Sequence, residues 1–415
     1  MIIHKLFRFE LMPNGEQIRK MKQFAGCSRF VYNRALAWQN EQYEKDNSFR
    51  LSYTKLTALL PAWRNELPWL KDCQAQLLQQ SLKDLENAFK NFFAKRSNFP
   101  KFKHKGSKDS FRFPQYFKLE QYNNRIYLPK IGWVRYRNSR NVIGKAKNIT
   151  VSQKCGKWYA SIQTEWEIEA PRPNGGEIGI DMGIVRFATL SNGEYFEPIN
   201  AFKTYKGKLA KLQRRFKNKS KFSKNWQKLK AKIAKLHYKI ANIRRNYLHQ
   251  ISNTISKNHA IVYIEDLHIK NMSKSAKGTS EQPGKNVKQK SALNRAILDQ
   301  SWYEFRRQLD YKLFWSGGYL IPVPPQNTSR CCPACGYTAK ENRQTQSKFE
   351  CVECGYQNNA DVVGAINILK RGQELLAAQQ KQFFRAGHAR CVCEVNRAAR
   401  RSAAETHRSE SAEHR

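Results

Sequence analysis

The order of apolar and polar residues predicts that a strand begins the chain and that helices follow it. Residues 1–11 alternate charged with apolar side chains, which is typical of a strand. Residues 15–98 then show helical spacing in several pieces, the clearest over 79–93. We expect this helical stretch to be interrupted where glycine or proline occurs, at Gly26, Pro61 and Pro68.

From residue 99 to residue 170 the pattern changes to short strands with alternating apolar side chains. A small antiparallel β-barrel made of residues 99–170 and completed by residues 1–11 accounts for both pieces. Residues 12–98 are then a helical lobe inserted into this barrel. The proline- and glycine-rich stretch 171–176 is typical of a linker between domains.

The next part of the chain predicts a mixed sheet. We expect three antiparallel strands, over 177–181, 184–190 and 194–196, with a turn at Asn192 and Gly193. Helix and then an apolar strand over 260–264 follow. This order indicates a ribonuclease-H-like fold, so the fold class that we expect for the whole chain is α/β and multidomain.

The remaining segments are assigned from composition and spacing. Residues 273–292 are rich in Ser, Lys and Gly, and we expect a mobile loop there. An apolar stripe from Leu298 to Leu313 predicts one helix, and residues 319–323 predict another strand. Residues 372–415 show little pattern, and we expect them to be a disordered tail without an assigned function.

The charge of the chain is its most unusual property. Its 415 residues include 75 Lys and Arg against 33 Asp and Glu, a net charge of +42. Such a chain repels itself unless a polyanion is bound, so we expect nucleic acid as the partner. The charge argues against an enzyme that acts only on small molecules.

Basic residues are concentrated in one predicted helical hairpin. Residues 201–250 contain seventeen Lys and Arg and no acidic residue, and the apolar positions repeat at spacings of four and three. A solvated charged face normally mixes both signs, so this segment favours phosphate contact. A second patch, residues 99–105 with 111–113, interleaves aromatic rings with cations, and there base stacking and a flexible barrel edge remain equal alternatives.

Four cysteines have the spacing of a structural metal site. Cys332 and Cys335 form one CxxCG turn, and Cys351 and Cys354 form a second. Four thiolates on two tight turns suit one tetrahedral zinc ion, and a site filled by protein ligands is structural. Four free thiols are the alternative. The tail pair Cys391 and Cys393 is interpreted as incidental.

Three acidic residues are candidates for a catalytic metal site: Asp181, Glu265 and Asp361. Asp181 lies in an apolar strand, Glu265 ends the strand over 260–264, and Asp361 precedes a helical run. Each also has an ordinary explanation: a turn hydrogen bond, a strand exit and a helix N-cap. Together on a ribonuclease-H-like sheet they can hold two divalent cations. Asp266 is excluded because side chains alternate along a strand.

No window approaches 18 consecutive apolar residues, and residues 1–10 lack the core of a signal peptide. We therefore expect no membrane partner and a cytoplasmic location. The close cysteine pairs also favour metal binding in a reducing compartment over disulfides.

The motifs together resemble the TnpB (OrfB) family of bacterial insertion sequences, which is related to the type V CRISPR effectors. The resemblance covers about residues 1–370. It is carried by the sequence around five sites in this order: Asp181, Glu265, Asn327, the paired CxxCG turns and Asp361. N-terminal segments from Arg8 to Pro13 and from Gly26 to Asn33 match as well.

This resemblance implies an RNA-guided DNA endonuclease encoded by a transposable element. It implies a transposon-derived guide RNA, and double-stranded and single-stranded DNA as target. The resemblance also implies four domains. They are a wedge-like barrel (1–11 and 99–170), a recognition lobe (12–98), and a RuvC-like nuclease (177–328 and 358–371) interrupted by a zinc ribbon (329–357). The family triad falls on Asp181, Glu265 and Asp361, with two Mg²⁺ ions. The candidates for nucleic-acid contact in the hairpin are Arg214, Arg215, Arg244 and Arg245.

Two other functions remain open at this stage. Some relatives have lost acidic residues and act as RNA-guided repressors without cleavage, but the triad of this chain is intact. A transposase that joins DNA ends is the second alternative, although the usual acidic order Asp, Asp, Glu is absent. The sequence leaves the guide RNA, the flanking DNA motif and the oligomeric state open.

Overall fold

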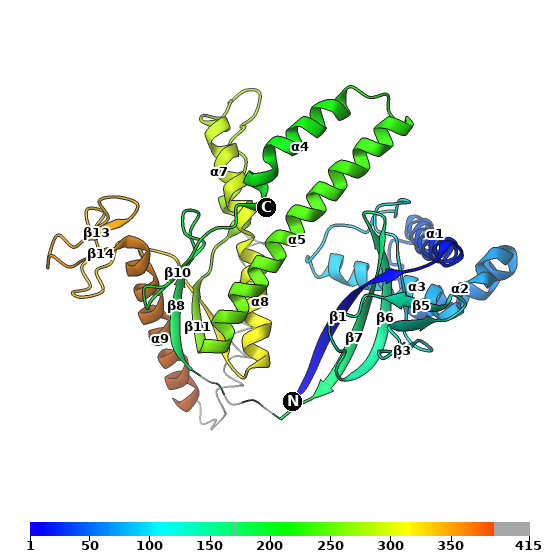
Figure 1. Cartoon of the computed structure of the whole chain (residues 1–415), viewed down its shortest axis with the longest axis horizontal. Helices are drawn as coiled ribbons and strands as arrows, with labels where there is room; N and C mark the ends of the chain where they lie inside the picture. The colour runs from blue at the N-terminus through cyan, green and yellow to red at the C-terminus, as the bar shows by residue number, and fades with distance from the viewer. Residues whose placement is uncertain (170, 172, 174, 386–415) are drawn as a thin grey trace. The chain divides into compact units, whose positions relative to one another are not determined.

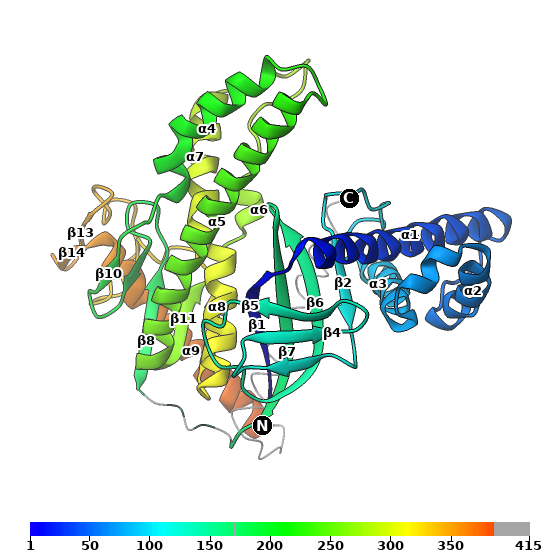
Figure 2. The same ribbon diagram turned by 45° about the vertical axis from the view of Figure 1, so that its right-hand side comes forward.

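The computed structural model describes residues 1–169, 171, 173 and 175–385. These residues fall into two compact units, Met1–Glu169 and Ala170–Arg415. Figures 1 and 2 show their helices and strands. Over the described residues, no helix combines the length and the apolar character that a membrane span requires.

The first unit is built on a seven-stranded sheet in the order β2-β6-β7-β1-β5-β4-β3. Its strands are β1 (Ile2–Met12), β2 (Ser110–Phe113), β3 (Lys118–Glu120), β4 (Arg125–Leu128), β5 (Gly132–Tyr136), β6 (Lys145–Lys154) and β7 (Lys157–Glu167). The N-terminal strand β1 pairs antiparallel with both β7 and β5, so the prediction that it completes the later strands is confirmed. Closure into a barrel is not confirmed, because the described strand order ends at β2 and β3.

The inserted helices of this unit share one core with the sheet. They are α1 (Gly15–Lys45), α2 (Tyr53–Glu66), the short 3-10 helix η1 (Pro68–Asp72) and α3 (Ala75–Phe93). Alternate residues of β1, among them Phe7 and Phe9, are buried with Phe24 of α1 and Leu82 of α3. Helices α1 and α3 both contact β2.

Two of the three predicted helix interruptions are wrong. Helix α1 runs through Gly26, because the neighbouring Cys27 is buried in the shared core and compensates for the weak helix propensity of glycine. Pro61 lies inside α2 rather than at its end. Pro68 does mark a boundary, since it opens η1.

The second unit is built on a five-stranded mixed sheet in the order β10-β9-β8-β11-β12. Its strands are β8 (Gly176–Asp181), β9 (Ala188–Leu190), β10 (Tyr195–Phe196), β11 (His259–Glu265) and β12 (Tyr319–Val323). Strands β8, β9 and β10 are antiparallel, whereas β11 runs parallel to β8 and to β12. The predicted order of three antiparallel strands, helix and a further strand in a mixed sheet is confirmed.

Helices cover both faces of this sheet (Figure 1). They are α4 (Ala201–Lys217), α5 (Lys224–Asn258), α6 (Ile269–Met272), α7 (Val287–Gln300), α8 (Trp302–Trp315) and α9 (Ala360–Arg385). Ile180 and Ile264 pack with residues of α5 and α8, whereas Tyr263 and Val323 face Ile368 of α9 on the other side. A two-stranded ribbon, β13 (Lys348–Glu350) and β14 (Gln357–Asn359), leads directly into α9.

Several predicted boundaries in this unit are wrong. The strand predicted over 184–190 is reduced to β9, because the chain bends before Ala188. Part of the predicted loop 273–292 is helical, since α7 begins at Val287. The stripe from Leu298 to Leu313 is broken at Ser301, which has a positive φ of 58°.

The C-terminal boundary also differs from the prediction. Helix α9 continues to Arg385, past the expected start of the tail at residue 372, because Leu376 is still buried. Cys391 and Cys393 lie outside the described residues.

Gly179 of β8 is a point where the sheet and α9 approach each other closely. A Cβ at this position would lie 2.2 Å from the carbonyl oxygen of Ala365 and 2.8 Å from the amide nitrogen of Leu369. We expect Gly179→Ala to push α9 away and lower the free energy of unfolding by about 1–3 kcal/mol. Gly207→Ala, in open space inside α4, should instead stabilise by about 0.5–1 kcal/mol. Thermal unfolding of both variants measures this, and equal midpoints would contradict it.

Candidate functional site

The first acidic residue of the site lies where β8 ends against α9. Asp181 is the last residue of β8. A Cβ at Gly364 of α9 would lie 3.0 Å from Oδ2 of Asp181. Glycine at this position of α9 therefore leaves the space that the carboxylate occupies.

Glu265 ends the neighbouring strand at the same edge of the sheet. Strand β11 runs parallel to β8 with Ile264 opposite Ile180, so the next residue of each strand is a carboxylate. Glu265 is buried, and the Thr328 hydroxyl donates a 2.8 Å hydrogen bond to its Oε1. The amide of Asn367 in turn donates to the Thr328 carbonyl at 2.7 Å, which fixes this segment to α9.

Asp361 completes the group from the first turn of α9. Its backbone N–H donates to Oδ1 of Asn359 at 3.0 Å, so Asn359 has the capping role and Asp361 is not the N-cap. Asp361 and Gly364 are three residues apart, which places them on one side of the helix. Asp266 is ion-paired with Arg306, and the structure thus gives it a partner outside the group.

The three carboxylates repel one another in a buried setting. Burial, followed by the negative charges of Glu265 and Asp361, raises the pKa of Asp181 to about 8. Burial also raises the pKa of Glu265, against the opposing effects of the Thr328 hydrogen bond and of Arg371 and Arg343. Such a cluster of buried anions is favourable for cation binding.

Within the described part of the chain, only the cysteines bring three or more candidate ligand atoms within 4.8 Å of one another. The three carboxylates do not form so close a group, and their oxygen atoms are therefore spread more widely than the cysteine sulfur atoms.

The sequence analysis missed two arginines at this site. Nη2 of Arg343 lies 3.7 Å from Oδ1 of Asp361, and its charge lowers the pKa of Asp181 against the larger effect of burial. Arg371 of α9 is tethered to the carbonyls of Pro324 and Gln326 at 2.9 and 2.7 Å. Arg343 lies between the two cysteine pairs, where no motif or periodicity singles it out.

The four cysteines come together, as their spacing predicts, in a cluster that could hold a metal ion. All four Sγ atoms lie within 4.8 Å of one another, with 3.6 Å between Cys332 and Cys354 and between Cys335 and Cys351. Gly336 and Gly355 follow the pairs with positive φ values of 79° and 70°, which closes two equivalent turns. Four sulfur ligands without an open position fit one structural zinc ion.

The basic hairpin also forms as predicted, from α4 and α5. Its apolar seam includes Leu209, Leu236 and Ile240, and the turn lies between Lys217 and Lys224. Arg214, Arg215 and Arg245 are exposed on the outside of these helices. Helix α5 extends to Asn258, eight residues past the predicted end of the hairpin at 250.

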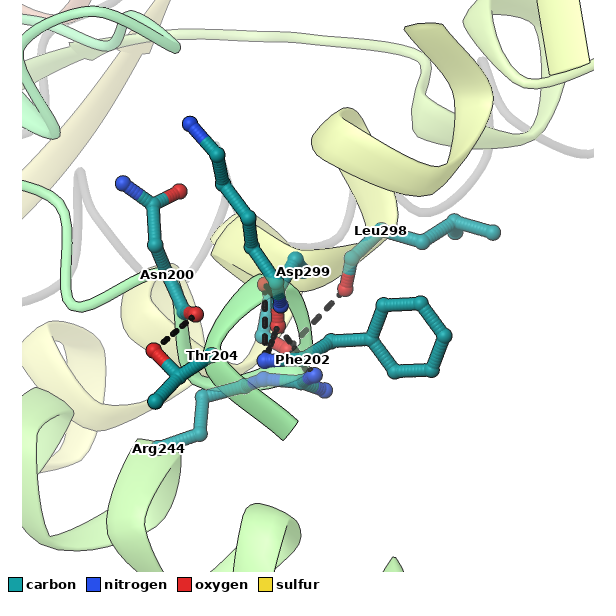
Figure 3. A network of polar contacts seen from close by, with 8 residues as sticks. Asn200, Phe202, Thr204, Arg244, Leu298 and Asp299 are labelled. Carbon is teal, nitrogen blue, oxygen red and sulfur yellow. Dashed lines mark hydrogen bonds and ion pairs between the residues drawn. The ribbon is translucent and has the colours of Figure 1, made fainter. Parts of the chain in front are cut away.

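Arg244 differs from the other three candidate arginines, because it binds a buried carboxylate (Figure 3). Its Nη2 lies 2.5 Å from Oδ1 of Asp299 at the end of α7. Asp299 also accepts the backbone N–H of Phe202 at 2.9 Å and thereby caps the start of α4. This contact assigns Arg244 a role in holding the hairpin on the fold, and it makes Arg244 the poorest of the four candidates for nucleic acid.

Known protein families match the parts of the chain that contain the acidic residues and the cysteines. Residues 161–276 match the OrfB family of IS605, described as "Probable transposase", and residues 1–48 match its "Helix-turn-helix domain". Residues 302–368, which include the four cysteines and Asp361, match the "Cas12f1-like, TNB domain". A solved Cas12f1–sgRNA–target DNA complex shares the fold, with a TM-score of 0.57, 13% identity, and coverage of 88% of this chain and 98% of that chain.

Two curated relatives match nearly the full length. "Putative RNA-guided DNA endonuclease InsQ" of Escherichia coli K12 is 58% identical over 374 residues, covering 89% of this chain and 93% of InsQ. A "Putative RNA-guided DNA endonuclease" of Streptomyces pristinaespiralis is 31% identical over 414 residues, covering 95% of this chain and 97% of the relative. The resemblance inferred from the motifs is thereby confirmed, and the chain belongs to the TnpB (OrfB) family of IS605-type elements.

Proposed function

We propose that this protein is an RNA-guided, metal-dependent DNA endonuclease encoded by a transposable element, with a RuvC-like active site at Asp181, Glu265 and Asp361. The observation that carries the proposal is the placement of Asp181 and Glu265 at adjacent strand ends, with Asp361 of α9 near enough to raise the pKa of Asp181, in a chain of net charge +42. The names of the two relatives point to the same activity. A guide RNA derived from the transposon would select the target by base pairing.

The residues at the sheet edge fit two Mg²⁺ ions, held by Asp181, Glu265 and Asp361. Such ions supply an activated water and charge stabilisation for hydrolysis of a phosphodiester bond. The Thr328 hydrogen bond orients the Glu265 carboxylate, while the packing of α9 on β8 sets the position of Asp361 relative to Asp181. Arg343 is placed to bind a phosphate oxygen beside Asp361.

The rest of the chain supports nucleic-acid binding around this site. We assign phosphate contacts to Arg214, Arg215 and Arg245 on the exposed side of the hairpin. In the first unit, residues 1–11 and 99–170 would form the wedge domain and residues 12–98 the recognition lobe. The zinc ribbon, 329–357, positions Arg343. Target DNA would be bound both as duplex and as separated strands, and the site of action would be the bacterial cytoplasm or nucleoid.

Substitution of one acidic residue separates cleavage from RNA binding. Asp181→Asn should lower DNA cleavage by the ribonucleoprotein more than about a thousandfold, because it removes a metal ligand, while RNA binding is preserved. Asp266→Asn, one residue past Glu265 and paired with Arg306, should cut normally. Cleavage of matched DNA with Mg²⁺ and filter binding of RNA measure both effects.

The outcomes of this experiment distinguish the alternatives. A wild-type ribonucleoprotein that binds matched DNA without cutting it would support a repressor instead. Covalent strand-transfer products would support a transposase. Equal loss of cleavage and RNA binding in Asp181→Asn would contradict the assignment of Asp181.

Arg343 should contribute to catalysis and not to overall affinity. We expect Arg343→Ala to slow single-turnover cleavage by roughly 10²–10³-fold, because a cation that faces the developing charge is lost. Lys340→Ala removes an exposed charge from the same cysteine-rich segment and should cleave at the normal rate. Similar slowing in both variants would assign the effect to general charge loss.

The zinc ligand set can be tested against a neighbouring cysteine. Cys351→Ser should reduce bound zinc from one ion per chain to nearly none and lower the thermal midpoint, since binding energy is folding energy. Cys331→Ser should retain the zinc, because Cys331 lies outside the four-sulfur cluster. Elemental analysis of both purified variants measures the bound zinc. Loss of zinc from Cys331→Ser would mean that Cys331 is a ligand and that the proposed set of four cysteines is wrong.

A further inference from the structure

The tip of the basic hairpin, defined here as residues 214–230, carries a cluster of three aromatic rings. The rings of Phe216 and Trp226 lie 5.0 Å apart at an interplanar angle of 31°, and those of Phe222 and Trp226 lie 5.6 Å apart. Figures 1 and 2 both show α4 and α5 meeting at the end of the hairpin remote from the sheet. The rings therefore lie where the core of the second unit does not require them.

Phe222 is presented to solvent by a strained backbone. Its side chain is 69% exposed and its φ is +68°, a conformation that bulky residues rarely adopt. The turn is held in place, because the side chain of Gln227 donates to the Phe222 carbonyl at 3.0 Å and Ser223 caps α5 through the Trp226 amide. An exposed ring in a strained, fixed turn gains little from folding, which points to a binding role.

The charge around these rings selects the kind of partner. Residues 214–230 contain eight Lys and Arg and no acidic residue. Nζ of Lys230 lies 4.9 Å from the centre of the Trp226 ring, and Nζ of Lys221 lies 5.3 Å from that of Phe222. A second copy of the tip would be repelled. Aromatic rings among cations are the arrangement that stacks on bases while binding the phosphates between them.

We propose that the hairpin tip is a stacking site for an unpaired base of the bound RNA, with the exposed ring of Phe222 as its platform. An aromatic ring can stack only on a base that is not enclosed in a duplex. Structured RNA offers such bases in loops and bulges, whereas duplex DNA must first be opened. This proposal rests on the proposed function in one respect, namely that the polyanion bound by the protein is RNA.

A pair of RNA probes tests the stacking directly. The full-length protein, freed of copurified nucleic acid, is titrated with a fluorescent oligouridylate and with an abasic oligomer of equal length and charge. Phe222→Ala should weaken oligouridylate binding on the order of tenfold and leave abasic binding unchanged. Phe222→Trp should restore the affinity. Lys221→Ala should weaken both probes and reduce the salt dependence by about one counterion.

Photocrosslinking locates the contact. An oligonucleotide containing 4-thiouridine should crosslink at Phe222 or Trp226, as mapped by mass spectrometry, and a DNA probe with 4-thiothymidine should crosslink less there. Equal weakening of both RNA probes by Phe222→Ala, preferential crosslinking of the DNA probe, or stronger binding of the tip to anionic vesicles would overturn the proposal. These readouts need neither metal nor cleavage, so an absence of DNA cleavage would refute the proposed function alone.

Discussion

The structure depends on one unfavourable interaction, the mutual repulsion of three carboxylates held at the buried edge of a sheet. Burial first, and then the negative charges of Glu265 and Asp361, raise the pKa of Asp181. The backbone brings these residues near one another, because β8 and β11 are paired in parallel and α9 packs directly on Gly179. Stability lost at this edge is compensated by the apolar faces of the same sheet, which pack on α5 and α8. A bound cation would relieve this repulsion.

The cysteine-rich segment and the acidic site are connected by hydrogen bonds. Helix α9 begins at Ala360, and the amide of that residue donates to the carbonyl of Ser347 at 2.9 Å in the segment between the cysteine pairs. The side chain of Asn367 binds the carbonyls of Thr328 and Cys331, both at 2.7 Å. These contacts tie the segment that carries the cysteines to the start of α9 and to the loop that orients Glu265. A zinc ion there would act on the acidic site through geometry, at a distance from the chemistry.

Short sequence patterns predicted the features that depend only on residues close together in the sequence. The alternation along β1, the heptad-like seam of the hairpin and the two CxxCG turns each appear within a few residues of sequence. Side chains whose role depends on a distant partner could not be predicted in this way. Arg244 looks like its neighbours in the sequence, and only the fold brings it to Asp299, 55 residues later. The proposed role of Arg343 could not be predicted from the sequence either, because it depends on the contact of Arg343 with Asp361.

Short-range patterns also failed where tertiary packing outweighed them. The apolar stripe from Leu298 to Leu313 suggests one continuous helix, yet the backbone turns at Ser301 and leaves Leu298 54% exposed. Gly26 reads as an interruption, but burial of its neighbours in the core keeps α1 intact. In both places the sequence pattern is compatible with two structures, and contacts with residues far along the chain choose between them.

The same distinction explains how the hairpin can present its charges. An isolated pair of helices with seventeen cations and no acid would repel itself, and its apolar seam is narrow. Asp299 counters this at the base, where it binds both the start of α4 and Arg244 of α5 and so joins the two helices to α7 (Figure 3). Ring packing of Phe216 on Trp226 joins the helices again near the turn. The cations between these two ties are therefore carried on a rigid support, and polyanion binding can relieve their repulsion without first having to order the helices.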